Sequence, residues 1–178
     1  MQNKITLVVG RKGHGKTTWT KEQLRGKSRL LIVDHLREYR DGLIFTTFDQ
    51  LAEYFETEPK KFCCICRFED DDEVSALLSF AYELGKVTVV AEEVDKTLCS
   101  PNSIDQSLYD IINYGRHRQI DMFCCARRAG DVHACRDVVV ADFVSGREHP
   151  GGRRAAAEQL RRRADSKPGE CVSRRCVE

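Results

Sequence analysis

The sequence predicts a single α/β domain, with a mostly parallel sheet that carries helices on both faces. Two observations predict this fold. Short runs rich in Val, Ile, Leu and Cys alternate with helix-like segments, and the runs are apolar at nearly every position, as in strands buried on both faces. In addition, the first of these runs leads directly into a glycine-rich loop and then a helix.

The elements follow one another as β and α in turn. The first strand, KITLVVG, is short and β-branched, and the helix after the loop ends at Gly26, since glycine often follows the last helical turn. The acids of EDDDEV complement the dipole at the start of a later helix. The remaining predicted strands are 29–34, 62–68, 87–93, 121–127 and 138–146. The remaining predicted helices are 48–57, 71–84, 103–115 and 152–164. A Pro-Gly turn and an alternating tail predict a last strand or hairpin.

The glycine-rich loop matches the phosphate-binding pattern G-x-x-x-x-G-K-[ST] without a mismatch. Its glycines let the backbone turn tightly and direct N–H groups at phosphates, and the helix N-terminus adds partial positive charge. Lys16 would reach the β- and γ-phosphates of ATP, and the Thr17 hydroxyl would ligate Mg²⁺. The side chains of Lys12 and His14 fill variable positions and are assigned no chemistry. The predicted nucleotide-binding residues are Gly10, Arg11, Lys12, Gly13, His14, Gly15, Lys16, Thr17 and Thr18.

Two adjacent acids, Glu92 and Glu93, follow the apolar strand VTVVA. Glu92 can hold the hydration shell of Mg²⁺ opposite Thr17, so Thr17 and Glu92 are the predicted metal residues. Glu93 can polarise a water molecule for in-line attack on the γ-phosphate, which makes it the predicted catalytic base. This pairing is typical of NTPases that transfer the phosphoryl group to water. ATP hydrolysis is therefore the predicted reaction.

Composition favours a globular protein of the cytoplasm. The 178 residues are 41% hydrophobic and 32% charged, which suffices for a full core. No apolar run approaches the ~18 residues of a membrane span, and the N-terminus has no apolar signal region. Several of the nine cysteines lie in apolar runs, as in FCCICRF, and we expect them to be reduced and buried. On a strand, Cys63 and Cys66 would point to opposite faces, which disfavours a zinc site.

Four segments resemble the HerA/FtsK superfamily of P-loop ATPases, and in particular its small viral branch, the genome-packaging ATPases of tailless double-stranded DNA viruses. In chain order they are GRKGHGKTT, LLIVDHLREY, VTVVAEEVD and NYGRHRQIDMFCCARRAGDV, and the later ADFVSGRE and KPGECVSRR also resemble that family. The resemblance implies a RecA-like P-loop NTPase fold of the additional-strand, catalytic-Glu class, with ATP and Mg²⁺ as ligands. It also implies a homo-oligomeric ring that pulls double-stranded DNA through its pore in the host cytoplasm, with a capsid or portal protein as a further partner.

The resemblance assigns roles to the acids and to one basic segment. Glu93 matches the catalytic glutamate of the family, whereas Glu92 stands where the family usually has Asp, so its extra methylene requires some rearrangement of the Mg²⁺ contact. The segment GRHR matches one that supplies basic residues near the nucleotide of a neighbouring subunit. Arg116 is therefore the predicted arginine finger, with Arg118 as the alternative.

Three further positions match the family without a settled role. Arg127 stands where the family usually places a polar sensor residue, commonly Gln. The guanidinium of Arg127 can contact the γ-phosphate. It cannot orient water as the Gln amide would, since a guanidinium only donates hydrogen bonds. Alternatively, Arg127 and Arg128 line a surface at the end of the strand. Asp34 and Tyr39 match a recurrent family pattern, and their spacing indicates no chemistry.

The charge distribution suggests separate surfaces for separate partners. Residues 43–114 carry five basic side chains against fifteen acids, whereas residues 145–178 carry nine against five. The basic C-terminal part, at about 150–178, contains the predicted helix and the final strand or hairpin of the single domain 1–178. A candidate DNA-facing stripe in it consists of Arg153, Arg154, Arg161, Arg162 and Arg163. A solvated helix face explains these arginines equally well.

The function predicted from the sequence is that of a DNA-translocating ATPase, a subunit of a viral genome-packaging motor. One alternative is a small-molecule P-loop kinase, which would leave Glu93 without a role. A second is a phage morphogenesis or secretion ATPase of the zonular-occludens-toxin type, although such proteins usually carry a membrane span. A third is a nucleotide-gated scaffold without turnover.

Overall fold

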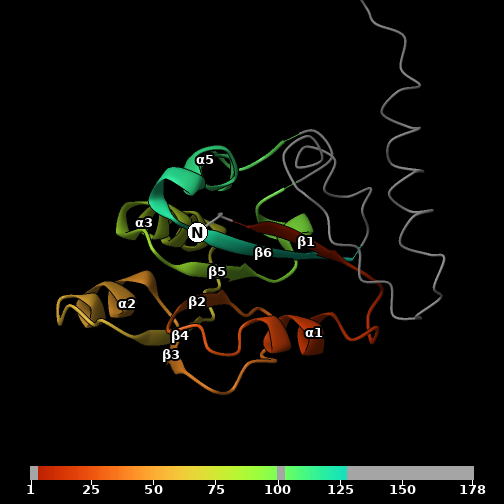
Figure 1. Ribbon diagram of the computed structural model, residues 1–178, viewed down its shortest axis with the longest axis horizontal. Helices are drawn as coiled ribbons and strands as arrows, with labels where there is room; N and C mark the ends of the chain where they lie inside the picture. Colours follow the sequence, from red (N-terminus) through yellow and green to blue (C-terminus); the bar gives the residue numbers. More distant parts are fainter. Residues whose placement is uncertain (1–3, 100–102, 128–178) are drawn as a thin grey trace, which may run out of the picture. The chain divides into compact units, whose positions relative to one another are not determined.

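The computed structural model describes residues 4–99 and 103–127, and this part of the chain forms one parallel sheet with its helices. Its strands are β1 (Ile5–Val9), β2 (Arg29–Val33), β3 (Leu43–Phe45), β4 (Phe62–Cys66), β5 (Thr88–Ala91) and β6 (Asp121–Ala126). They lie in the order β1-β6-β5-β2-β4-β3, and Figure 1 shows them side by side. Every neighbouring pair runs parallel, which confirms the predicted parallel sheet.

The helices are α1 (Lys16–Gln23), α2 (Phe48–Phe55), α3 (Asp71–Leu84), α4 (Val94–Thr97), α5 (Gln106–Tyr114) and the 3₁₀ helix η1 (Gly115–Arg118). Helices α2, α3 and α5 bury Leu51, Leu77 and Ile111 in the larger of two apolar clusters. Trp19 of α1 packs against the smaller cluster, beside Phe123 of β6. Trp19 is thus partly buried against the core.

The two clusters lie on opposite faces of the sheet, because neighbouring residues of a strand point to opposite sides. In β2, Leu31 and Val33 belong to the larger cluster, and Leu30 and Ile32 belong to the smaller one. The same alternation runs through β4, β5 and β6. Both faces of the central strands are therefore covered, as their continuous apolar sequences predict.

The strands end where the sequence becomes polar, one or two residues before the predicted limits. Strand β2 ends before Asp34 and β5 ends before Glu92. Helices α2 and α5 are likewise shorter than predicted, and α1 ends at Gln23, before Gly26. The carboxyl ends of the parallel strands therefore present polar side chains at one edge of the sheet.

Strand β3 and the short helices α4 and η1 were not expected from the sequence. Strand β3 has three residues and lies at the edge of the sheet, where Leu43 and Ile44 are about half exposed, so its pattern is that of a loop. Gly42 permits its close approach to β4: a Cβ at this position would lie 2.6 Å from the carbonyl oxygen of Cys63.

Four of the strand cysteines, Cys64, Cys66, Cys124 and Cys125, are buried as predicted, whereas Cys63 is only partly buried. Cys63 packs toward the smaller apolar cluster and Cys66 lies in the larger one, on opposite faces of β4. Within residues 4–99 and 103–127, no group of three or more His, Cys, Asp or Glu side chains could hold a metal ion. The same part of the chain contains no helix that is both long and apolar enough to cross a membrane. The strand, helix and hairpin predicted beyond residue 127 lie outside the described residues, as does Arg128.

Candidate functional site

The glycine loop joins β1 to α1 and takes a shape that depends on its glycines. Gly13 and Gly15 have φ of 81° and 77°, in the left-handed region that favours glycine. Gly15 precedes the first residue of α1, and its carbonyl accepts the N–H of Trp19 at 2.9 Å, the first hydrogen bond of the helix. The loop thus delivers the chain directly into a helix N-terminus, where unpaired N–H groups attract anions.

Lys16 and Thr17 begin that helix, and both line a pocket at the carboxyl ends of the strands. The Lys16 ammonium donates to the carbonyl of Gly10 at 2.8 Å, which holds the side chain back along the loop. From there it can exchange a neutral carbonyl for a phosphate oxygen, a stronger partner because the hydrogen bond is then between opposite charges.

The pocket brings together most of the predicted site residues. Those that line it are Lys12, Gly13, Gly15, Lys16, Thr17, Thr18, Glu92, Glu93 and Arg127. Gly10, Arg11 and His14 shape the loop without lining the pocket: the N–H of Gly10 donates to Ala126 of β6, and the N–H of His14 donates to Arg11. Thus β1, β5 and β6, far apart in the sequence, meet at one site.

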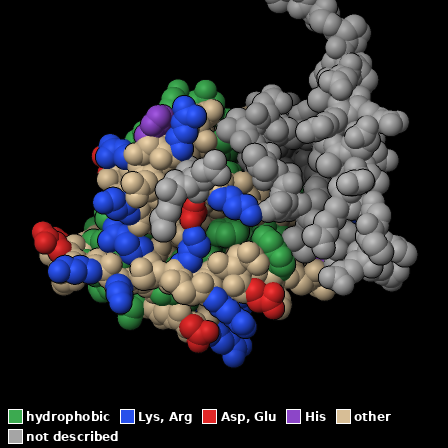
Figure 2. Space-filling model, viewed as in Figure 1, with side chains coloured by type: hydrophobic (Ala, Val, Ile, Leu, Met, Phe, Trp, Pro, Cys, Tyr) green, Lys and Arg blue, Asp and Glu red, His purple; other side chains and the backbone are tan. Residues whose placement is uncertain are grey.

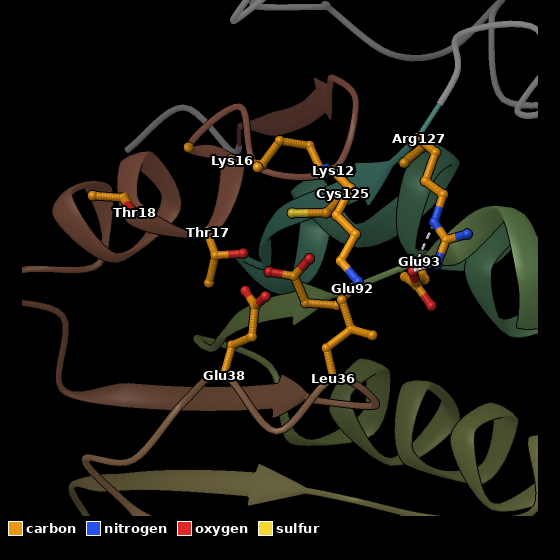
Figure 3. Close-up of a pocket in the computed structure, with 13 residues that line it drawn as sticks. Lys12, Lys16, Thr17, Thr18, Leu36, Glu38, Glu92, Glu93, Cys125 and Arg127 are labelled. Atoms are coloured by element: carbon orange, nitrogen blue, oxygen red, sulfur yellow. Dashed lines mark hydrogen bonds and ion pairs between the residues drawn. The ribbon is translucent and has the colours of Figure 1, made fainter. Parts of the chain in front are cut away.

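Glu92 directly follows β5 and is only 2% exposed. Its Oε1 accepts a hydrogen bond of 3.0 Å from the hydroxyl of Tyr39, and the Cys125 thiol also donates to the carboxylate. Burial raises the pKa of Glu92, while the donors from Tyr39 and Cys125 and the charge of Lys16 act in the opposite direction. Figure 3 shows the carboxylate directed toward Thr17.

The donor set at this corner fits Mg²⁺. The Thr17 hydroxyl and the Glu92 carboxylate are hard oxygen ligands that line the same pocket, and no cysteine or histidine cluster competes among the described residues. Few protein ligands are needed, because nucleotide phosphates and water supply most of the coordination of Mg²⁺.

Glu93 has an unusual backbone and two cationic partners. Its φ and ψ of 53° and 42° place it in the left-handed region, where a non-glycine residue is strained, and it caps the N-terminus of α4. Oε1 accepts two hydrogen bonds from the Arg127 guanidinium (Figure 3), one of them at 2.9 Å from Nε. Oε2 lies 2.5 Å from Nζ of Lys96. Burial by itself would raise the pKa of Glu93, but these two cations lower it overall. Glu93 is therefore ionised, as a general base must be.

Arg127 does more than line a surface, because it joins the end of β6 to the predicted base. It also lines the pocket, and its side chain is 47% exposed. A guanidinium at this place can bind either the Glu93 carboxylate or a phosphate oxygen. The predicted sensor position is thus in the same pocket as the glycine loop.

Four pocket residues were missed by sequence reasoning, of which Cys125 and Ala126 end strand β6 beside Arg127. Leu36 and Glu38 belong to the turn after β2, and they line the pocket opposite the glycine loop. In Figure 3 the Glu38 carboxylate points toward the corner formed by Thr17 and Glu92. The position of β2 beside β5 brings this turn to the site, and that pairing cannot be read from the local sequence.

The two candidate arginine fingers differ in their surroundings. Arg116 is exposed on η1, and its Nε donates to His117 at 3.2 Å. Arg118 lies 3.5 Å from Glu83 and its guanidinium stacks 5.3 Å from the centre of the Tyr82 ring. Neither arginine lines the pocket formed by the described residues. Arg116 is the freer of the two to meet a second molecule.

Comparisons with known proteins bear on the fold. No protein-family model and no curated protein matches the chain. Among solved structures, the genome packaging NTPase B204 from Sulfolobus turreted icosahedral virus 2, in complex with ATP-gammaS, matches with a TM-score of 0.67 at 18% sequence identity. The match covers 89% of this chain and 86% of that chain.

Two other solved structures also have a similar fold. B204, the DNA-packaging ATPase from Sulfolobus turreted icosahedral virus, matches with a TM-score of 0.62 at 17% identity over 91% of this chain and 89% of that chain. The N-terminal domain of zonular occludens toxin from Neisseria meningitidis matches with a TM-score of 0.54 at 14% identity over 85% and 81%. These likenesses confirm the predicted RecA-like α/β fold of a P-loop NTPase.

Proposed function

We propose that this chain is an ATP-hydrolysing subunit of a ring-shaped motor that moves double-stranded DNA, of the viral genome-packaging type. One observation carries the proposal. A single pocket unites the phosphate loop, the acid pair Glu92 and Glu93, and Arg127, each from the carboxyl end of a different strand. The likeness in fold to a viral genome-packaging NTPase supports the choice of motor.

In the proposed reaction, the loop N–H groups and Lys16 bind the phosphates of ATP. Thr17 and Glu92 would hold Mg²⁺, which would supply positive charge to neutralise the negative charge that develops on the phosphates. Glu93 accepts a proton from the attacking water while the water oxygen bonds to the γ-phosphorus. The bond from phosphorus to the bridging oxygen breaks, and ADP and phosphate leave.

For Glu93 to act, one of its present partners must move. Both carboxylate oxygens are occupied, one by Arg127 and one by Lys96. Because Arg127 lies beside the pocket, we propose that it transfers from Glu93 to a γ-phosphate oxygen when ATP binds. This exchange frees one oxygen of the base for water and places positive charge where the transition state gains negative charge.

Completion of the site by a second copy is part of the proposal. Arg116 is exposed and does not line the pocket formed by the described residues of its own chain, so it would reach a nucleotide from a neighbouring subunit. An arginine supplied in trans can accelerate phosphoryl transfer by about 10³- to 10⁵-fold. Turnover would then require a homo-oligomer, which also gives DNA a pore to pass through.

The proposed reaction is tested by asking where the γ-phosphate goes. With radiolabelled ATP in single turnover, a motor should yield inorganic phosphate as the labelled product without any acceptor. Label that stays in ATP until a small-molecule acceptor is added would indicate a kinase. No consumption of ATP in either arm, with nucleotide bound, would leave the scaffold alternative.

DNA binding is proposed on the basis of charge. On the face shown in Figure 2, Lys and Arg cover more of the described surface than Asp and Glu do. The sequence of the predicted basic helix near 152–164 contains Arg161, Arg162 and Arg163. Binding to phosphates must be independent of sequence and must weaken with salt, with a slope of log affinity against log salt of about −0.9 per phosphate contact. Replacing the three arginines by Gln should flatten that slope by roughly two to three. An unchanged slope would move the DNA contact to other residues, starting with Lys60 and Lys61.

A second candidate function rests on the similarity to the zonular occludens toxin domain. In that case the same ATPase domain would drive assembly or secretion of a filamentous phage. Duplex DNA separates the candidates, since only a DNA motor requires that DNA stimulate hydrolysis. For the motor we further propose the host cytoplasm as its location and a capsid or portal protein as its docking partner.

A further inference from the structure

A buried carboxylate anchors the turn that follows β2. Asp34 has no exposed surface, and its two oxygens accept the N–H groups of Glu38 at 2.8 Å and Tyr39 at 3.1 Å. The guanidinium of Arg67, which follows β4, contacts the same carboxylate at 3.2 Å. Arg67 also donates to the carbonyl of Tyr39 at 2.7 Å. Both backbone polar groups of Tyr39 are therefore held by charged side chains.

The side chain of Tyr39 is fixed as firmly as its backbone. It is 4% exposed, and its ring packs in the smaller apolar cluster with Ile32 and Val90. The ammonium of Lys21, from α1, lies 5.0 Å from the ring centre on one face. Because a tyrosine ring has only two rotatable bonds, this packing fixes the position of its hydroxyl. That hydroxyl donates to Oε1 of Glu92 at 3.0 Å.

Glu92 is a residue for which such a restraint matters. A glutamate has one more rotatable bond than an aspartate, so its carboxylate can take more positions at the end of a strand. The hydrogen bond from Tyr39 holds Oε1 of Glu92, and the carboxylate is directed toward Thr17 at the pocket corner (Figure 3). Thus a chain of contacts runs from Asp34 and Arg67 through Tyr39 to the predicted metal residue.

We propose that Tyr39 is a positioning residue that holds Glu92 in the orientation required for the divalent cation of the nucleotide. The inference rests on the proposed function, because it concerns the same nucleotide pocket. The simpler alternative is that the hydroxyl only satisfies a buried carboxylate. The positioning role and this simpler alternative predict different results. If Tyr39 positions Glu92, loss of its hydroxyl weakens nucleotide binding in the presence of Mg²⁺ and leaves nucleotide binding in the absence of Mg²⁺ unchanged.

The test measures the affinity for a non-hydrolysable ATP analogue in Mg²⁺ and in EDTA, using the full chain. Tyr39→Phe keeps the ring and removes the hydroxyl. We expect its affinity in EDTA to equal that of wild type, and the gain in affinity on adding Mg²⁺ to fall by about three- to tenfold, the value of one hydrogen bond. Tyr54→Phe is the matched control. This tyrosine packs on Phe45 and Phe55, away from the pocket, and the gain should not change.

A double variant shows whether the effect passes through Glu92. In Glu92→Gln the gain from Mg²⁺ should already be small, and adding Tyr39→Phe should reduce it no further. A Tyr39→Phe protein with an unchanged gain, or with equal losses in Mg²⁺ and EDTA, would overturn the proposal. Should Tyr39→Phe not fold, Arg67→Lys loosens the same turn and must reduce the same gain. If wild type binds no nucleotide in either buffer, the proposed function itself fails.

Discussion

Replacing Glu93 by Gln separates catalysis from folding and binding more cleanly than any other single change. The amide is nearly isosteric with the carboxylate, but it cannot accept a proton from water at neutral pH. We expect turnover to fall by about 10²- to 10⁴-fold, the usual contribution of a general base. Nucleotide affinity should be kept or increased, because one negative charge near the phosphates is removed.

The structure limits how far the same change can destabilise the fold. It weakens ion pairs to Arg127 and Lys96, whose side chains are 47% and 51% exposed and can be rehydrated. Pairs with such exposed partners contribute about 0–1 kcal/mol each, a small part of a typical stability of about 5–15 kcal/mol. Thermal unfolding, binding of an ATP analogue and steady-state phosphate release should be measured on one preparation. Turnover equal to that of wild type would refute the assignment and make Glu92 the next candidate for the base.

Three further predictions concern nucleotide binding, assembly and stability. Lys16→Ala should abolish productive ATP binding, because it removes the cation that meets the β- and γ-phosphates; retained affinity in a direct binding assay would contradict this. Mixing Arg116→Ala subunits with Glu93→Gln subunits should restore part of the hydrolysis, since some interfaces then pair an intact base with an intact arginine; co-assembly without rescue would show that Arg116 does not act in trans. Asp105→Ala should lower the free energy of unfolding by about 1–2 kcal/mol at neutral pH, because the carboxylate caps α5 through the N–H groups of residues 107 and 108. Burial would raise the pKa of Asp105, but its hydrogen bonds lower it overall. The stabilisation by the Asp105 carboxylate is therefore present above the unfolded pKa of about 3.9 and is lost at lower pH. Urea titrations should show the stabilities of variant and wild type converging at low pH.

The parts of the site that are contiguous in sequence could be predicted from it. Lys16 and Thr17 lie in the pocket because six residues of loop between a strand and a helix determine their place. The acids Glu92 and Glu93 were predicted for a similar reason, since they follow a buried strand. The backbone strain of Glu93 could not be predicted, because it depends on the short helix α4 that the residue caps.

The contacts that could not be predicted from the sequence join residues that are distant in the chain. Tyr39 and Glu92 are 53 positions apart, and they meet because β2 and β5 are neighbours in the sheet. Asp34 and Arg67 meet because β2 also pairs with β4. The sequence indicated Asp34 and Tyr39 as a recurrent pair without a chemical role. Only the strand order shows that the pair is linked to the pocket, through the hydrogen bond from Tyr39 to Glu92.

The claim that this chain is a DNA motor is tested most directly by its rate of ATP hydrolysis, measured with and without duplex DNA over a range of protein concentrations. We expect the rate per subunit to rise with protein concentration, because Arg116 must come from a neighbouring copy. Duplex DNA of any sequence should increase the rate further, and this increase should weaken as salt is added. A rate per subunit that is the same at every protein concentration and unaffected by DNA would show that the chain is not a motor of this kind.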